Sequence, residues 1–292
     1  MKKFSRLNQH FYRKVKVIIA IFLLLSLACV MYLVNQKSDQ KKQVQPTNKI
    51  SSNKSQKTKN INTPPSISIV VINLGLNKSI FEKAMTLPKK VTLGFSPYSP
   101  YLDYILELTQ REKRDIIMNI PTDTLVLKDY SFEDNGAYAL SSDLEDAENI
   151  ERLNFVISKA TQFNGYYTSI NDSFTDTADN LTILLNKIKE SQKYIMYNDP
   201  RMVKPFREVG TELKMQNRII EAHVLIDSEL EKSKIEIQLN ALKNIAGAYG
   251  YAIGIARAYN ISIDQINKWL EIADKNKKYN VIPLSELINE RF

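Results

Sequence analysis

The stretch Ile67-Ser-Ile-Val-Val-Ile-Asn-Leu-Gly75 determines how the rest of the chain is interpreted. It is rich in β-branched residues and almost continuously apolar, which predicts a buried β-strand. Continuous apolarity, rather than alternation, indicates that both faces of the strand are covered, as in a parallel sheet or barrel. A helical pattern at 78–86 follows directly. Functional side chains of such folds lie where the strands end, so the first candidate is Asn73.

The alternation of strand and helix patterns continues to the end of the chain. Further β-rich runs lie at 91–96, 115–120, 165–170, 193–197, 219–226, 250–256 and 279–283. Helical patterns separate them at 100–113, 143–161, 178–191, 202–214, 229–247 and 262–276, the last with a capping-box start at Ser262 and Gln265. About eight strands alternating with about seven helices predict an α/β fold with a parallel sheet, and a distorted (β/α)7–8 barrel rather than an open sheet.

The N-terminal region has a different composition. Residues 17–34 carry no charge and follow six Lys or Arg residues without an acid. This pattern predicts a cytoplasmic basic tail at 1–16 and a transmembrane signal anchor at 17–34, which crosses the inner (cytoplasmic) membrane once and leaves the rest periplasmic. Signal-peptide cleavage and lipidation at Cys29 are the alternatives. The polar, basic segment 35–65 is expected to be a disordered linker, which leaves 66–292 for the barrel domain.

Charge and composition narrow the function further. The formal net charge is +8, but residues 1–65 carry +12 and the remaining 227 residues carry −4. A nucleic-acid partner is therefore not expected. The single cysteine, Cys29, allows no disulfide within the chain and no zinc site of cysteine ligands. Of the two histidines only His223 falls in the domain, and a packed, hydrogen-bonded side chain is expected there rather than a ligand or base.

Several short motifs resemble the divergent polysaccharide deacetylase family in their order and spacing. They are Ile69-Val-Val-Ile-Asn-Leu-Gly, Val91-Thr-Leu-Gly-Phe-Ser-Pro-Tyr-Ser-Pro, Ile116-Ile-Met-Asn-Ile-Pro, Gly165-Tyr-Tyr-Thr-Ser, His223-Val-Leu-Ile-Asp, Ala252-Ile-Gly-Ile-Ala-Arg and Val281-Ile-Pro-Leu-Ser-Glu-Leu. The resemblance covers residues 66–290 and implies a distorted β/α barrel of the carbohydrate-esterase type, exported and often anchored. It also implies an ancestral activity, because the wider superfamily removes acetyl groups from N-acetylated sugars with a metal held by one Asp and two His.

The positions that would carry this chemistry differ from the family pattern. Ile72 and Asn73 stand for an Asp-Asp pair, and Asn119 and Ser169 stand for the two histidines. The other differences are Tyr167 and Thr168 for two Asn, Tyr197 for an Asp, and Arg257 and Ala258 for a His-Pro pair. Only Asp227 is retained. Since a site of one Asp and two His needs two imidazoles in one domain, we expect no metal, no cofactor and no catalytic residue, that is, a pseudoenzyme.

Polar and aromatic side chains after the predicted strands suggest a ligand-binding cleft instead. The candidates are Asn73, Tyr98, Asn119, Asp123, Tyr167, Ser169, Asn171, Asp172, Tyr197, Asp199, Asp227 and Arg257. The expected partner is a cell-envelope glycan, an N-acetylated sugar polymer, with the membrane contacted through 17–34. Two alternatives stay open: a metal-independent carbohydrate hydrolase that uses carboxylates of this rim, and a structural or protein-interaction module without a sugar ligand. Aspartates that follow strands also commonly cap the next helix.

Overall fold

The computed structural model describes residues 64–122, 136–170, 178–276 and 278–292. They belong to one compact unit, Ile61–Phe292. The expected transmembrane anchor at 17–34 and nearly all of the expected linker lie outside the described residues. Within those that are described, no helix has the length and apolarity needed to cross a bilayer.

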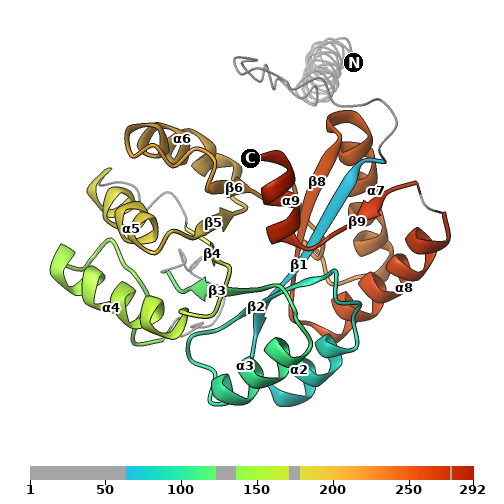
Figure 1. Cartoon of the computed structure of the whole chain (residues 1–292), viewed down its shortest axis with the longest axis horizontal. Helices are drawn as coiled ribbons and strands as arrows, with labels where there is room; N and C mark the ends of the chain where they lie inside the picture. The colour runs from blue at the N-terminus through green and yellow to red at the C-terminus, as the bar shows by residue number, and fades with distance from the viewer. Residues whose placement is uncertain (1–63, 123–135, 171–177, 277) are drawn as a thin grey trace, which may run out of the picture. The chain divides into compact units, whose positions relative to one another are not determined.

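A curled parallel sheet forms the centre of the unit (Figure 1). Its strands are β1 (Ser66–Leu74), β2 (Thr92–Phe95), β3 (Ile116–Ile120), β4 (Gly165–Thr168), β5 (Tyr194–Tyr197), β6 (Ile219–Glu221), β7 (Val224–Leu225), β8 (Tyr251–Arg257) and β9 (Asn280–Val281). They are hydrogen-bonded in the order β6-β5-β4-β3-β2-β1-β8-β7, and β9 pairs with the start of β1. Every pair is parallel, which confirms the predicted class of fold.

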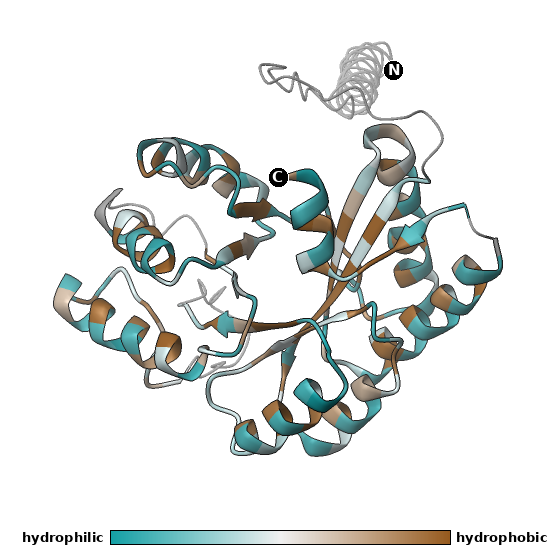
Figure 2. Ribbon diagram, viewed as in Figure 1, coloured by the Kyte–Doolittle hydropathy of each residue, from teal (hydrophilic) through white to brown (hydrophobic). Residues whose placement is uncertain are grey.

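Helices cover the outside of the sheet. They are α2 (Lys78–Met85), α3 (Leu102–Arg111), α4 (Asp146–Lys159), α5 (Ala178–Glu190), α6 (Val203–Glu212), α7 (Lys232–Tyr249) and α8 (Asn260–Asn276), with a short 3-10 helix, η2 (Pro200–Met202), before α6. Figure 2 shows that these helices turn their hydrophobic sides toward the sheet. The larger of two hydrophobic clusters fills this layer, around Phe81, Phe95, Tyr166 and Phe206. The order of elements therefore follows the predicted alternation closely.

One extended segment joins the two ends of the sheet. β6 pairs with β5, whereas β7 pairs with β8, and only Ala222 and His223 lie between β6 and β7. The N–H of Ala222 donates to the carbonyl of Tyr197, and the N–H of His223 donates to the carbonyl of Ile253, both at 2.8 Å. The expectation of a single continuous strand at 219–226 was therefore wrong. We call this junction, residues 219–225, the seam.

A final helix, α9 (Leu284–Arg291), closes the amino-terminal end of the curled sheet and was not predicted. Its Leu284 and Leu287 pack in the second hydrophobic cluster with inward side chains of the strands, such as Val70, Ile117 and Ile253. Because α9 packs against the centre of this end, the first place to look for the family's site is the opposite end, where the strands finish. We call the opposite end the mouth.

The first turn of α9 is held by side chains from two other elements. The N–H of Leu284 donates to Thr92 Oγ1 at 2.9 Å, and the N–H of Ser285 donates to Asp115 Oδ2 at 3.1 Å. Thr92 Oγ1 in turn donates to the same carboxylate oxygen at 2.6 Å, and Asn164 Nδ2 donates to Asp115 Oδ1. Asp115 is 5% exposed and acts as the N-terminal cap of a helix far away in sequence.

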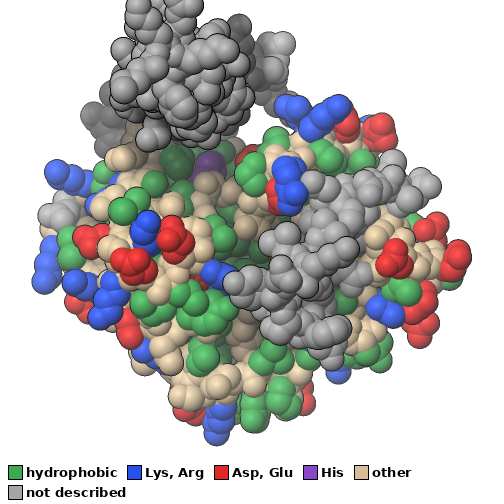
Figure 3. Space-filling view, turned by 180° about the vertical axis from the view of Figure 1, so that it is seen from behind, with side chains coloured by type: hydrophobic (Ala, Val, Ile, Leu, Met, Phe, Trp, Pro, Cys, Tyr) green, Lys and Arg blue, Asp and Glu red, His purple; other side chains and the backbone are tan. Residues whose placement is uncertain are grey.

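The described surface carries both signs of charge. Figure 3 shows Lys and Arg side chains interspersed with Asp and Glu on the face opposite to that of Figure 1. A nucleic-acid interface typically carries a stripe or patch of basic side chains. The face seen in Figure 3 carries both charges instead.

Candidate functional site

Asn73 stands at an irregular point of β1, at the mouth. Its φ angle is +64°, in the left-handed region, and the pairing of β1 with β2 shifts between Val71 and Leu74. Such a bulge re-aims a side chain, and asparagine is one of the few residues that tolerate the left-handed conformation. Asn73 is exposed, whereas the residues on either side of it are buried. The bulge therefore presents the Asn73 carboxamide at the end of a buried strand.

Asn119 on β3 contacts Asn73 across the mouth. Its Nδ2 donates to Asn73 Oδ1 at 2.5 Å. Asn119 is 7% exposed, and its Oδ1 has no hydrogen-bond partner among the described residues. A Cβ atom at Gly94, on the strand between them, would lie 3.0 Å from this oxygen, so the glycine makes room for it. A buried carbonyl oxygen without a partner is costly, which makes it a candidate contact for a ligand.

Tyr167 on β4 contributes a second inward polar group. Its hydroxyl donates to Asn198 Oδ1 at 2.9 Å, and the residue is 5% exposed. Burial raises the pKa of Tyr167 above its usual value; the charge of Arg257 opposes this rise and that of Asp227 adds to it. The hydroxyl therefore stays protonated and serves as a hydrogen-bond donor.

Asp227 is fully buried and hydrogen-bonded on both carboxylate oxygens. Its Oδ2 accepts from the Arg257 N–H and from Ser262 Oγ, each at 2.8 Å, and its Oδ1 lies 3.4 Å from Arg257 Nε. A further bond runs from Arg257 Nη2 to the carbonyl of Asp227. Ser262 lies inside α8, which begins at Asn260, so the expected capping box at Ser262 was wrong. The carboxylate ties the end of β8 to α8.

The other candidates differ in their surroundings. Tyr197 lies away from the mouth, because its ring stacks on Phe206 of α6 at 4.2 Å and 7° in the outer layer. Tyr98 accepts from the Tyr138 N–H at 3.0 Å, and Ser169 is exposed after β4. Asp199 caps η2 and pairs with Arg201, whose hydrogen bonds lower the pKa of the Asp199 carboxyl. Asp123, Asn171 and Asp172 lie outside the described residues.

One residue of the mouth, Asn198, was missed from sequence, and Ser262 of α8 was given another role than the structure shows. Asn198 directly follows the predicted strand at 193–197, so its position could have identified it. Ser262 was noticed, but as a helix cap rather than as a donor to Asp227.

The comparisons with known proteins decide the family. The family model described as divergent polysaccharide deacetylase matches residues 69–288. The chain belongs to the divergent polysaccharide deacetylase family. None of the proteins with curated descriptions matches the chain at a comparable level.

Solved structures share the fold of this chain. An uncharacterized protein from Agrobacterium tumefaciens C58 is 25% identical, with a TM-score of 0.69, over 78% of this chain and 91% of that one. A putative cellobiose-phosphate cleavage protein from Enterococcus faecalis V583 is 10% identical, with a TM-score of 0.52, over 77% and 99%. The catalytic domain of a peptidoglycan N-acetylglucosamine deacetylase from Eubacterium rectale ATCC 33656 is 11% identical, with a TM-score of 0.47, over 79% and 94%. The similarity to the Enterococcus faecalis protein, at 10% identity, shows a common fold alone. The Eubacterium rectale domain, with a TM-score of 0.47, is too distant to support any conclusion.

The mouth of this deacetylase-family member does not fit the metal of the wider superfamily. Where the resemblance implies an acidic ligand and an imidazole, the structure has two carboxamides, and an N–H of Asn119 points at Asn73 Oδ1. Both oxygens of Asp227 are engaged by Arg257 and Ser262. In the part of the chain that the structure describes, no three His, Cys, Asp or Glu side chains are grouped closely enough to hold an ion. Neutral carboxamides are poor substitutes for carboxylate and imidazole ligands.

Proposed function

We propose that the chain is a membrane-anchored, extracytoplasmic member of the deacetylase family that binds a cell-envelope glycan without hydrolysing it. The observation that carries this proposal is the Asn73–Asn119 pair, which replaces ligand positions with amide groups and leaves the buried Asn119 Oδ1 without a described partner. The anchor rests on the apolar run at 17–34 and on the basic residues before it.

The chemistry of the mouth suits an N-acetylated sugar. Such a sugar offers an amide N–H and hydroxyl groups as donors, which the orphan oxygen of Asn119 would accept. Its carbonyl and hydroxyl oxygens would accept from the Asn73 amide and from the Arg257 guanidinium, whose side chain is 34% exposed. The mouth therefore offers donors and acceptors together, as a neutral polar ligand requires.

The two candidate carboxylates that the structure describes, Asp199 and Asp227, favour binding over hydrolysis. Metal-free glycoside hydrolysis needs one carboxylic acid with a raised pKa and a second carboxylate facing it. The pKa of Asp199 is instead lowered, chiefly by its hydrogen bonds from Arg201, and Asp227 is completely buried and fully engaged. Neither group is placed to protonate a glycosidic oxygen.

Replacing Asn73 by glycine is expected to weaken the binding of N-acetylglucosamine oligomers by at least about tenfold, the cost of roughly one good hydrogen bond. Glycine adopts the left-handed conformation without strain, so the loss of stability should be limited to the hydrogen bond from Asn119, about 1–3 kcal/mol, and the chain should stay folded. Calorimetric titration of the 292-residue chain measures the affinity, which should lie in a weak range because sugars gain little over the water they displace.

Lys214→Gly is the matched control, because Lys214 also has a positive φ, +58°, and is not part of the mouth. It should bind the oligomers as the unchanged chain does. If Asn73→Gly binds the oligomers as tightly as the unchanged chain, the mouth is not the glycan-binding site. If neither the unchanged chain nor any variant shows saturable binding, a structural or protein-interaction module is favoured.

A further inference from the structure

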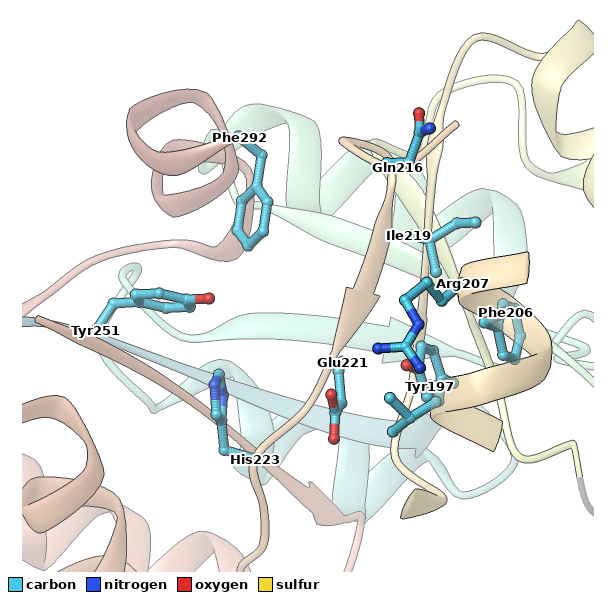
Figure 4. Close-up of a pocket in the computed structure, with 10 residues that line it drawn as sticks. Tyr197, Phe206, Arg207, Gln216, Ile219, Glu221, His223, Tyr251 and Phe292 are labelled. Carbon is cyan, nitrogen blue, oxygen red and sulfur yellow. The ribbon is translucent and has the colours of Figure 1, made fainter. Parts of the chain in front are cut away.

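A pocket opens at the seam, away from the mouth. It has a volume of about 240 Å³, and its lining includes Arg207 of α6, Ile219 and Glu221 of β6, His223 between β6 and β7, Tyr251 of β8 and Phe292 after α9. Figure 4 shows these side chains gathered around one space. None of Asn73, Asn119, Tyr167 and Arg257 lines it, so the two sites are chemically separate.

His223 presents one defined ring nitrogen to this pocket. Its Nδ1 accepts a hydrogen bond from the N–H of Ile253 at 3.1 Å, so the imidazole is neutral and carries its proton on Nε2. Partial desolvation of the ring lowers the pKa of His223, in agreement with the neutral form. The side chain is hydrogen-bonded, as the sequence predicted, but the residue is exposed rather than packed in the core. Nε2–H is therefore available as a donor.

Arg207 and Glu221 add a cation and an anion that do not neutralise each other. Within the described residues, neither the guanidinium of Arg207 nor the carboxylate of Glu221 has an ion pair or a hydrogen bond. Burial raises the pKa of the Glu221 carboxyl, because water is partly excluded from this part of the seam. Both residues are exposed, so water solvates them in the free chain and both charges are open to a ligand in the shared cavity.

The remaining walls are aromatic and apolar. The Tyr251 ring meets His223 edge-to-face at 5.4 Å and Phe292 at 5.8 Å, and Phe292 is 46% exposed. Ile219 lies on another side of the pocket. Such rings provide a flat apolar surface beside hydrogen-bonding groups.

This combination selects one class of ligand. A simple anion is repelled by Glu221 and a simple cation by Arg207. A small zwitterion would pair with both charges, but it would leave the aromatic wall and His223 Nε2–H unused. A hydroxyl group both donates and accepts, so neighbouring hydroxyls can donate to Glu221 and accept from Arg207 and His223 Nε2–H. The volume is below the range of pockets for drug-sized ligands, which restricts the ligand to about one ring. We propose that the seam pocket is a second binding site, which takes a single neutral sugar ring with its hydroxyls on Arg207, Glu221 and His223 and its carbon face on Phe292.

Titration of the 292-residue chain with glucose and with N-acetylglucosamine, followed by the NMR signals of the histidine rings, tests this proposal. The chain has only two histidines, so His223 is read against His10. We expect a saturable shift of the His223 signals with at least one of the two sugars, and none with glycine or inorganic phosphate. An equal or larger response to glycine or phosphate, or no saturable response to either sugar, would overturn the proposal.

Variants assign the response to the pocket. Arg207→Gln and Glu221→Gln roughly keep the size of each side chain and remove its charge. Each is expected to weaken the binding of the sugar by about tenfold, because hydrogen bonds to charged groups are stronger than those between neutral groups. Lys204→Gln, on the same helix but with an exposed side chain outside the pocket, is the control and should change nothing. Unchanged binding by both Arg207→Gln and Glu221→Gln would refute the site. Asn119→Ala should leave the His223 response intact, and loss of the response in that variant would show that the sugar acts from the mouth instead.

Discussion

Replacing Asp227 by alanine is expected to lower the free energy of unfolding by about 3 kcal/mol, because it leaves buried donors without an acceptor. The donors are the backbone N–H of Arg257 and the hydroxyl of Ser262, which is itself fully buried. The Arg257 guanidinium keeps 34% of its side chain exposed, so its lost ion pair contributes little. Urea denaturation of the variant and of the unchanged chain measures the difference.

Two milder variants separate the role of Asp227 from a general loss of packing. Asp227→Asn can place its oxygen where Oδ2 accepts both bonds, so it should cost only about 1 kcal/mol. Ser262→Ala should cost a similar amount, since only the bond from Ser262 Oγ is lost and Asp227 Oδ2 still accepts from the Arg257 N–H. If Asp227→Ala were as stable as the unchanged chain but failed to bind glycan, the retained acid of the family pattern would be a ligand contact rather than a structural one.

Replacing Asp115 by alanine should be at least as damaging, at about 3–5 kcal/mol, because one carboxylate serves three donors that are otherwise unpaired. These donors are the Ser285 N–H, Thr92 Oγ1 and Asn164 Nδ2, and Asp115 is 5% exposed. The variant also removes the negative charge from the N-terminus of α9, where it stabilises the helix. The midpoint of urea unfolding reports the effect.

Asp115→Asn and Thr92→Val provide the controls. Asp115→Asn keeps an acceptor for the hydroxyl and the helix N–H, so we expect it to recover more than half of the loss. Thr92→Val deletes the acceptor of the Leu284 N–H. Thr92 and Asp115 are hydrogen-bonded to each other. The double variant Asp115→Ala/Thr92→Val should therefore lose less free energy of unfolding than the sum of the losses in the two single variants. Strict additivity would contradict the shared cap.

The sequence predicted the order of elements because local patterns dictate them. The apolar run that opens the domain became β1, and the helical pattern at 229–247 became α7, Lys232–Tyr249. The family resemblance added the curled sheet, and the family match confirmed the resemblance. Asn73 and Asn119 were both candidates from their places at strand ends, and the structure joins them by a hydrogen bond.

The features that were missed depend on contacts distant in sequence. The break of the seam follows from the two partners of one segment, β5 and β8, which no local pattern reveals. α9 is capped by Asp115, whose carboxylate lies 170 residues earlier in the chain. Tyr197 lies at the end of a strand, as Asn73 and Asn119 do, but its side chain faces α6 because successive residues of a strand point to opposite faces. Its position in the sequence predicted that Tyr197 lies at the end of a strand, but not which face of the sheet its side chain is on.

The most direct test of a glycan-binding, non-hydrolysing mouth is one proton NMR experiment on N-acetylglucosamine oligomers mixed with the 292-residue chain and a divalent metal ion. The same sample reports contact, through saturation transfer from protein to sugar, and turnover, through the signal of free acetate. We expect saturation transfer that Asn73→Gly diminishes, and no acetate above that of a protein-free control. Acetate that accumulates with the chain and stops when a chelator is added would contradict the account.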